Sequence, residues 1–433
     1  MDRLLEILLG RIIRGRALTV ITASGRELTA GDGTGTPVTV RFTSRAWQLA
    51  VMLDPELRLG EAYMYGGLVI ERGSAADLLD IIVSNVGRRR DRLWVRLLKN
   101  CRAGIKRFIR DNTPRRSRHN ARHHYDIDRR IYELFLDPEK QYSCAYFEHD
   151  DASLEEAQQA KLRHIAAKLK LNDPGLRVLD IGSGWGGLGL YLARLLREQR
   201  RDQARGKPGD PREPSIAGAP QGSVVGINLS PEQIKFSRER AVAVGANCEF
   251  REQDYRRLTG KFDRIVSVGM FEHVGKRHYP QFFQKCFDLL TDDGVMLLHT
   301  IGRAHGPGET NAWVERYIFP GGYTPTLSEL APVIERSGFI VSDIEVLRLH
   351  YAKTLHLWRE RFLAQRDAAA KIRGEEFVRM WDWYLSGFEA SFKYFGLVVF
   401  QIQLIKDINA VALTRDYIYK TPKTDFAIQV AAE

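Results

Sequence analysis

The chain of 433 residues has few cysteines and no long apolar run, and each shortage excludes a class of protein. A membrane-spanning helix needs about 20 consecutive apolar residues, and no run in this sequence approaches that length. Residues 1–10 are interrupted by Asp2, Arg3 and Glu6 and lack a cleavage site, so they predict an amphipathic helix rather than a signal peptide. The four cysteines are too scattered for a metal site or a disulfide framework, which favours a reducing cytoplasm and no bound metal.

Acidic residues are also fewer than basic ones: the sequence has 54 aspartates and glutamates and 65 lysines and arginines, which gives a net charge of +11. The basic excess is concentrated between Arg88 and Arg118. Apolar residues, among them Trp94, recur in this run at helical spacing, which predicts a basic amphipathic helix. Such a helix could lie on an anionic membrane or pack against the chain's own domains, and both interpretations stay open. No nucleic-acid-binding motif accompanies the run, so we expect no nucleic-acid partner.

A glycine-rich turn is the most informative motif that the sequence does contain. Residues 178–187 read Val-Leu-Asp-Ile-Gly-Ser-Gly-Trp-Gly-Gly. Val178–Ile181 is typical of the end of a buried parallel strand, and Leu188–Leu196 has the periodicity of a helix. Glycines between such elements let the backbone approach a ligand at the carboxyl edge of the sheet. The turn also satisfies G-x-G-x-x-G, so a dinucleotide site and a purely structural turn are alternatives.

The side chains around this turn favour S-adenosylmethionine. Asp180 stands two residues before the first glycine, where its carboxylate could meet a cationic amino group. With Gly182 and Gly184, it is predicted to hold the methionine end of the cofactor. The next predicted strand ends at Asn228, where a dinucleotide site would want Asp or Glu for the ribose. We therefore expect Asn228 and Gln233 to face the ribose hydroxyls instead.

A third predicted strand, Cys248–Arg251, leads to residues suited to an adenine ring. Asp254 could accept from the adenine amino group, and Tyr255 could form a wall of the same site. The ordinary alternative is a solvated turn.

Five sequence blocks then point to one family. They are Gln141–Phe147, Val178–Gly187, Phe262–Gly275, Leu297–Gly302 and Tyr317–Gly322. In this order they resemble the cyclopropane-fatty-acyl-phospholipid synthases, which add a methylene from S-adenosylmethionine across a lipid double bond. The resemblance runs from about residue 122 to the C-terminal helices and, more weakly, through residues 38–85. It implies an α/β, Rossmann-like class I methyltransferase domain with added helices.

The resemblance also implies a set of catalytic residues. Methyl transfer to an isolated alkene produces a carbocation, which must lose a proton before a ring can close. The similar enzymes hold a bicarbonate ion as the base. Carried over by motif, its holders are Cys144, Glu272, His299, the backbone amide of Ile301, and Tyr351.

The same carry-over makes Tyr142 and Ser143 contacts of the cofactor. Each assignment has an ordinary alternative: Cys144, for example, could be a small buried hydrophobe, as most free cysteines are. Because Glu272 and His273 are adjacent, only one of them is expected to point inward.

The predicted organisation has three parts. Residues 1–87 are expected to form a small N-terminal α/β domain for lipid handling or for dimerisation into a homodimer. Residues 88–121 form the basic linker, and residues 122–433 form the catalytic domain. Within that domain, residues 197–222 are rich in Arg, Gln, Gly and Pro and read as a flexible or exposed insertion. Glu375–Ile408 carries aromatic residues at helical spacing, typical of core or of an acyl-pocket wall.

These observations predict a methyltransferase that forms cyclopropane rings on cis double bonds of unsaturated phospholipid chains. We expect it at the cytoplasmic face of a bacterial inner membrane, as a peripheral protein with no nucleic-acid partner. Acyl C-methylation without ring closure, or N-methylation of a small amine, is the alternative on the same fold. A lipid carrier that keeps the methyltransferase shell without activity is the alternative from another class.

Overall fold

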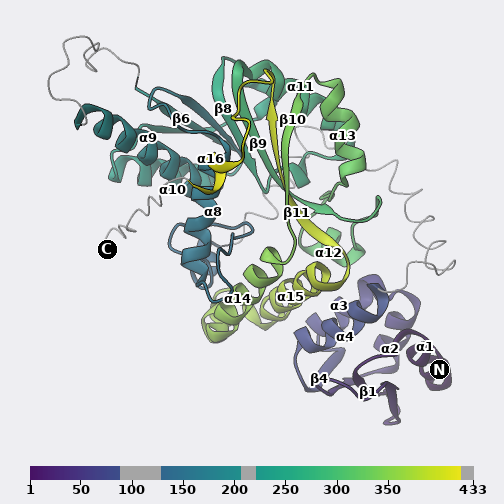
Figure 1. Ribbon diagram of the computed structural model, residues 1–433. Helices are drawn as coiled ribbons and strands as arrows, with labels where there is room; N and C mark the ends of the chain where they lie inside the picture. Colours follow the sequence, from purple (N-terminus) through teal and green to yellow (C-terminus); the bar gives the residue numbers. More distant parts are fainter. Residues whose placement is uncertain (88–127, 206–220, 421–433) are drawn as a thin grey trace, which may run out of the picture.

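The structure, a computed structural model, describes residues 1–87, 128–205 and 221–420 (Figure 1). The basic helix expected at residues 88–118 lies outside these ranges. Two β-sheets organise the described chain, one of four strands near the N-terminus and one of seven strands.

The four-stranded sheet and its helices come from the first 87 residues. In chain order the elements are α1 (Asp2–Ile12), β1 (Ala17–Ile21), β2 (Glu27–Gly31), β3 (Val38–Phe42), α2 (Arg45–Leu53), α3 (Pro55–Met64), β4 (Leu68–Arg72) and α4 (Ala75–Gly87). The strand order is β2-β1-β3-β4, in which only β1 and β3 run parallel. The amphipathic N-terminal helix is confirmed as α1, which buries Leu5. Only Leu28 of the five residues of β2 is buried.

The seven-stranded sheet carries the remaining elements. The main ones are α7 (Arg129–Glu133), α8 (Leu154–Lys168), β5 (Arg177–Ile181), α9 (Gly187–Arg205), β6 (Ser223–Asn228), α10 (Pro231–Ala243), β7 (Cys248–Glu252), β8 (Phe262–Val268), a 3-10 turn η3 (Phe271–His273), α11 (Tyr279–Leu289), β9 (Leu290–Arg303), α12 (Ala312–Tyr317), α13 (Leu327–Arg336), β10 (Ile340–Leu347), α14 (His350–Ala364), α15 (Arg366–Tyr394), β11 (Leu397–Ile405) and α16 (Asp416–Tyr419).

The sheet order is β10-β11-β9-β8-β5-β6-β7, and β11 is antiparallel to both of its neighbours. All neighbouring pairs from β9 to β7 are parallel. In Figure 1, α9 and α10 lie on one side of the sheet and α11 and α13 on the other. This is a three-layer, Rossmann-like arrangement, as the sequence predicted.

The prediction of a flexible or exposed insertion at residues 197–222 is partly wrong. Helix α9 continues to Arg205, so the first part of that segment is helical. Arginine and glutamine are good helix formers, and an exposed helix needs no apolar periodicity of its own. An i,i+4 ion pair between Arg194 and Glu198 extends over the predicted boundary. At the other end, the Gly222 amide donates to the Pro174 carbonyl at 2.8 Å as β6 begins.

The helical reading of Glu375–Ile408 is wrong beyond Tyr394. Leu397–Ile405 forms β11, and every residue of this strand is buried. A strand in the middle of a sheet that is covered on both faces reads as a continuous apolar run, which periodicity cannot distinguish from a buried helix. The turn before it needs Gly396, whose φ of +74° disfavours other residues.

The N-terminal unit packs on the catalytic part through α3, α4 and α15. The Tyr63 hydroxyl donates to Asp382 at 2.9 Å, and Arg359 pairs with the same carboxylate at 2.8 Å. Glu61, which is 2% exposed, accepts from the Tyr317 hydroxyl at 2.8 Å. One hydrophobic core continues from the four-stranded sheet into α15. The N-terminal unit therefore shares its core with the α14–α15 region, next to the site described below.

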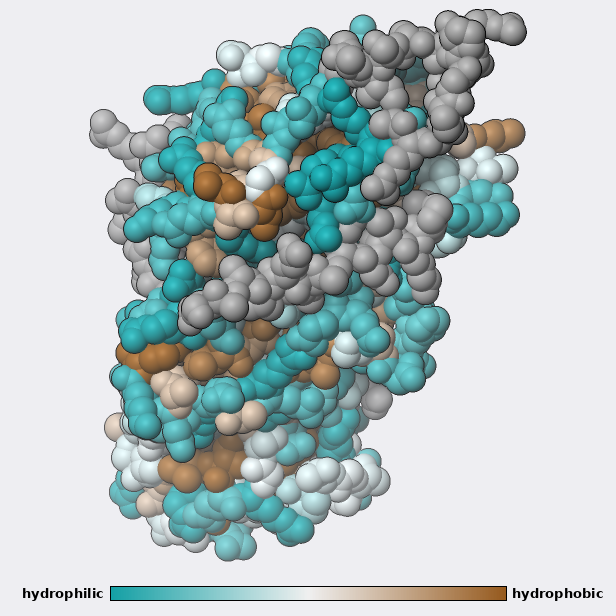
Figure 2. Space-filling view, turned by 90° about the vertical axis from the view of Figure 1, so that its left-hand side faces the viewer, coloured by the Kyte–Doolittle hydropathy of each residue, from teal (hydrophilic) through white to brown (hydrophobic). Residues whose placement is uncertain are grey.

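On the face shown in Figure 2, hydrophilic residues predominate and hydrophobic ones form separate patches. Within the three described ranges, no helix combines the length and the apolarity that crossing a membrane requires.

Candidate active site

The glycine-rich turn joins β5 to α9 at the carboxyl edge of the sheet. Strand β5 lies between β6 and β8, where the strand order reverses, and open α/β sheets bind ligands at such a switch point. Gly182, Gly184 and Gly186 all have positive φ angles, of +87°, +53° and +83°. A Cβ on Gly182 would lie 2.6 Å from Met270, and one on Gly186 would lie 2.7 Å from Ser237. A Cβ on Gly184 would meet nothing within 4 Å, so this glycine borders open space.

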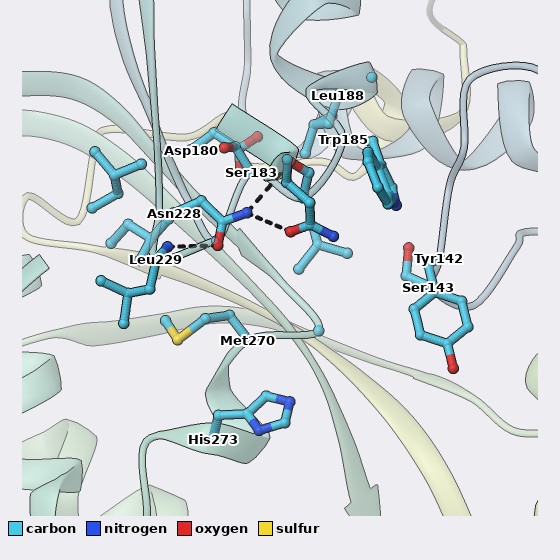
Figure 3. Close-up of a pocket in the computed structure, with 18 of the residues that line it drawn as sticks. Tyr142, Ser143, Asp180, Ser183, Trp185, Leu188, Asn228, Leu229, Met270 and His273 are labelled. Carbon is cyan, nitrogen blue, oxygen red and sulfur yellow. Dashed lines mark hydrogen bonds between the residues drawn. The ribbon is translucent and has the colours of Figure 1, made fainter. Parts of the chain in front are cut away.

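A single cavity at this edge is lined by every residue that the sequence assigned to the cofactor. These are Tyr142, Ser143, Asp180, Gly182, Gly184, Asn228, Gln233, Asp254 and Tyr255. Figure 3 shows Asp180 and Asn228 on one side of it, and Tyr142 and Ser143 on the other. The lining also includes Gln141, Lys161, Trp185, Met270 and His273, which the sequence did not assign to the cofactor.

The methionine end predicted around Asp180 contains buried polar atoms that have no partner among the described residues. Asp180 is 1% exposed, and burial raises its pKa to about 7 although the charge of Lys161 opposes the shift. Its Oδ2, the Ser183 hydroxyl and the Trp185 indole nitrogen find no hydrogen-bonding partner among the described residues. Buried polar atoms without partners are costly. A ligand with a cationic amino group and hydrogen-bonding atoms would satisfy them, so the site fits the methionine end of S-adenosylmethionine.

The wall predicted for the ribose is already organised by hydrogen bonds. The Asn228 amide donates to Gln233 Oε1 at 2.6 Å, and its Oδ1 accepts from the Leu229 backbone at 2.7 Å (Figure 3). Helix α10 starts here, with the Ser230 hydroxyl accepting from the Gln233 backbone and Pro231 in the first turn.

The residues predicted for the adenine both line the cavity. Asp254 is 6% exposed, so it is not a solvated turn residue. Its carboxylate is held by the Arg256 guanidinium at 2.6 and 2.9 Å. An adenine amino group would share that carboxylate with Arg256. Tyr255 packs edge-on against Phe282 with ring centroids 5.3 Å apart and forms a wall of the cavity.

Sequence reasoning missed Lys161, a fully buried lysine on α8. Its Nζ donates to Gln141 Oε1 at 2.6 Å and to the Ser143 hydroxyl at 3.0 Å. Burial lowers its pKa to about 8, while the charges of Asp137, Cys144 and Asp180 oppose that shift. Helical spacing could have indicated that Lys161 is buried, because it shares a helix face with the buried Gln158 and Ile165.

Three of the five predicted catalytic positions meet at the ends of β8 and β9. Glu272 Oε1 accepts from the Ile301 backbone amide at 2.5 Å, and burial raises the pKa of this carboxyl group. Its Oε2 is buried without a partner in the described part of the chain. His299 lies two residues before Ile301, on the same side of β9, and burial together with nearby cationic groups lowers its pKa to about 3.

The other two positions lie beside α14. The Ala145 amide donates to the Thr354 hydroxyl at 3.1 Å, which fixes Cys144 next to the helix. Tyr351 is one turn earlier on α14 and is buried against Trp358. Cys144 is fully buried, which raises the pKa of its thiol. The five positions thus form two groups, and the charge of Lys161 acts on a member of each, Cys144 and His299.

The expectation that only one of Glu272 and His273 points inward is wrong. Both belong to the 3-10 turn η3. Glu272 faces the Ile301 amide, whereas His273 lines the cofactor cavity, where burial lowers its pKa to about 4 (Figure 3). A 3-10 turn rotates successive side chains by about a third of a circle, so two neighbours can reach different parts of one interior.

A sheet in this order, with a glycine turn and a buried carboxylate at its switch point, defines an S-adenosylmethionine-dependent methyltransferase. The chain belongs to the mycolic acid cyclopropane synthetase family, whose family model matches residues 112–197 and 217–402. The predicted family is confirmed. It sets aside the dinucleotide interpretation of the glycine turn.

Individual relatives support this family assignment. The chain is 35% identical over 375 residues to the cyclopropane-fatty-acyl-phospholipid synthase of Escherichia coli strain K12, covering 86% of this chain and 89% of that protein. It is 37% identical over 312 residues to the "Probable fatty acid methyltransferase" of Pseudomonas putida, covering 68% and 73%. The mycolic acid cyclopropane synthase CmaA1, solved with SAH and CTAB, is 31% identical, with a TM-score of 0.55 over 66% of this chain and 97% of that chain.

Proposed function

We propose that the protein transfers a methylene from S-adenosylmethionine to the cis double bond of unsaturated acyl chains in phospholipids, forming a cyclopropane ring. The observation that carries this proposal is the juxtaposition of two features at one sheet edge. One is the cavity around the buried Asp180, and the other is the Glu272–Ile301 contact with His299 two residues before Ile301 on β9. The likeness to the Escherichia coli phospholipid enzyme supports the choice of substrate. Incubating the purified protein with S-adenosylmethionine carrying an isotope-labelled methyl group and with oleoyl phospholipid vesicles tests it, because the label should enter the acyl chain.

When bound, S-adenosylmethionine supplies an electrophilic methyl group on a sulfonium. The chain itself contributes aromatic residues around the cavity. Tyr142 lines the cofactor cavity, stacks on Trp358 with ring centroids 5.2 Å apart, and hydrogen-bonds the Tyr384 hydroxyl at 3.0 Å. It therefore joins the cavity to the aromatic cluster of α14 and α15. Aromatic faces stabilise cations and exclude water, so we place the reacting part of the acyl chain against this cluster.

The residues around Glu272 fit a small acid–base anion such as bicarbonate, which would accept the proton lost on ring closure. Burial favours the neutral, proton-donating form of Glu272, and its Oε2 lacks a partner in the described ranges. An anion there could accept from Glu272 and from His299. It could accept from the Ile301 amide only by displacing Glu272 Oε1, to which that amide donates in this structure. Cys144 and Tyr351 complete the proposed set from the α14 side.

We further propose that the enzyme works as a peripheral protein at the cytoplasmic face of the bacterial inner membrane. The basic segment 88–118 would dock it on anionic lipid, and residues 1–87 would serve lipid handling or dimerisation. A second candidate, C-methylation of a fatty acyl chain without ring closure, draws support from the Pseudomonas putida relative.

Cofactor affinity is expected to rise several-fold between about pH 6 and pH 7.5. Burial raises the pKa of Asp180 to about 7, so its carboxylate form grows as the pH rises through that value and can then pair with a cationic amino group. Above about pH 8 the gain should end, because α-amino groups lose their charge there. Titration calorimetry with S-adenosylmethionine should show the rising limb in the wild type and in Asp263→Asn, a control at the opposite end of the sheet. An Asp180→Asn variant that keeps the limb would contradict the assignment.

Vesicle binding is expected to depend on the basic segment. Changing Arg96, Lys99, Arg102 and Lys106 to glutamine should weaken sedimentation with anionic vesicles, each charge contributing about 1 kcal/mol near the surface. Added salt should weaken wild-type binding in the same direction. Activity on a detergent-dispersed short-chain lipid is the control and should change much less. Unchanged vesicle binding of the quadruple variant would show that another surface meets the membrane.

A further inference from the structure

A row of largely buried polar residues crosses the sheet beside the site. His299 on β9, Gln401 on β11 and Glu345 on β10 are directly in register with one another. His299 is 3% exposed and Gln401 is fully buried. Helix α8 contacts this row through two residues one turn apart, His164 and Lys168. Polar side chains in the interior of a sheet are costly unless each one is paired.

The contacts form a continuous chain. His164 Nε2 and Lys168 Nζ each lie 2.5 Å from Glu345 Oε2. Lys168 Nζ also donates to Gln401 Oε1 at 2.8 Å. At the end of the chain, Gln401 Nε2 lies 3.1 Å from His299 Nδ1. Although burial opposes it, the hydrogen bond and charge of His164 and the charge of Lys168 lower the pKa of Glu345 to about 2, so this carboxylate is ionised.

The donor and acceptor of each hydrogen bond from Lys168 through Gln401 to His299 follow from the positive charge of Lys168. A lysine ammonium can only donate, so it must face the oxygen of the Gln401 amide. The amide nitrogen of Gln401 is thereby turned toward His299, where it donates. His299 Nδ1 must then be an acceptor and carry no proton. Since burial and the surrounding charges keep His299 neutral, its one proton is on Nε2.

We propose that Lys168 and Gln401 are positioning residues that hold His299 as the neutral Nε2–H tautomer. His299 then presents a fixed N–H donor to its surroundings and cannot act as a base through Nε2. This inference rests on the proposed function, in which His299 helps to hold an acid–base anion. A donor suits an anion, whereas the opposite tautomer would turn a lone pair toward it. A wrong histidine tautomer can disable an active site whose geometry is otherwise intact.

The tautomer can be read directly by nitrogen NMR of the full-length protein labelled with [¹⁵N]histidine. The His299 signals are identified by their absence from a His299→Gln sample. The wild type should show an unprotonated Nδ1 and a protonated Nε2. In Gln401→Glu, the new carboxylate should accept a proton from the ring, so Nδ1 should become protonated.

The matched control is Gln403→Glu, the same change two residues along the same strand. Gln403 is equally buried and contacts the Lys168 carbonyl instead of His299. The Gln403→Glu variant should leave the His299 signals unchanged and should lose much less activity than Gln401→Glu. In Gln401→Glu, kcat should fall at least tenfold, with the KM for S-adenosylmethionine within about twofold of the wild type. Lys168→Met, which frees the Gln401 amide to turn, should give a mixture of tautomers.

Two results would overturn the inference: a wild-type His299 protonated on Nδ1, or Gln401→Glu and Gln403→Glu with equal kcat and equal spectra. If Gln401→Glu does not fold, the wild-type spectrum alone decides. The proposed function fails separately. A protein with the expected tautomer that forms no cyclopropane lipid would refute the function and leave the tautomer assignment standing.

Discussion

Replacing Glu272 by glutamine is expected to lower kcat by two to four orders of magnitude and to leave S-adenosylmethionine affinity nearly unchanged. Glutamine has the same shape, and its oxygen can still accept from the Ile301 amide, which lies 2.5 Å from Glu272 Oε1 in the wild type. It cannot share a proton with an anion, and losing a positioned acid–base group costs about 10²–10⁴ in rate. Steady-state kinetics and calorimetry on the same preparation separate the two effects.

Glu329→Gln is the control for losing a carboxylate from this region. Glu329 is also largely buried, but it caps α13 and binds Tyr323 and Lys276. Its loss should lower the melting temperature and leave kcat within a few-fold of the wild type. Near-normal turnover of Glu272→Gln would remove Glu272 from the proposed mechanism.

Replacing Gly184 by valine is expected to weaken cofactor binding about a hundredfold or more, some 3 kcal/mol. The added side chain enters the open space beside the turn, since a Cβ there meets no atom within 4 Å. The backbone, at a φ of +53°, also becomes strained by about 1–2 kcal/mol. The fold should survive, because the added Cβ meets no neighbouring atom.

Gly245→Val separates strain from obstruction. Gly245 has a φ of +57°, its Cβ would also meet nothing within 4 Å, and it does not line the cofactor cavity. Both variants should therefore lose similar stability in thermal unfolding, whereas calorimetry should show weakened S-adenosylmethionine binding only in Gly184→Val. Equal affinity in the two variants would mean that the turn is structural.

The part of the site built from local sequence was predictable. The strand, the glycine turn and the capped start of α10 are each set by residues close together in the chain, and their side chains converge on one cavity. Parallel strands bring their carboxyl ends to the same edge, so each residue could be placed from its position after a strand. The resemblance supplied the residues that local patterns do not identify, such as Cys144.

The parts that depend on distant pairing could not be predicted. Lys168 and Glu345 are each an ordinary charged residue in sequence. The sheet register places Glu345 beside Gln401, and the packing of α8 on the sheet brings Lys168 to both. Two glutamines in the otherwise apolar run Leu397–Ile405 were a signal of buried hydrogen bonding, but periodicity alone assigned that run to a helix. The extension of α9 to Arg205 was hidden because an exposed helix has no apolar pattern.

The most direct test of ring formation is analysis of phospholipids from a bacterial host, lacking its own synthase, that expresses this chain. We predict acyl chains heavier by one methylene, formed at the expense of monounsaturated chains and resistant to ozonolysis, because a cyclopropane has no double bond to cleave. The Glu272→Gln variant, expressed at the same level, should give almost none of this product. Products of the same mass that ozonolysis cleaves, or a saturated methyl branch, would contradict ring closure, and an unchanged lipid profile would contradict the proposed substrate.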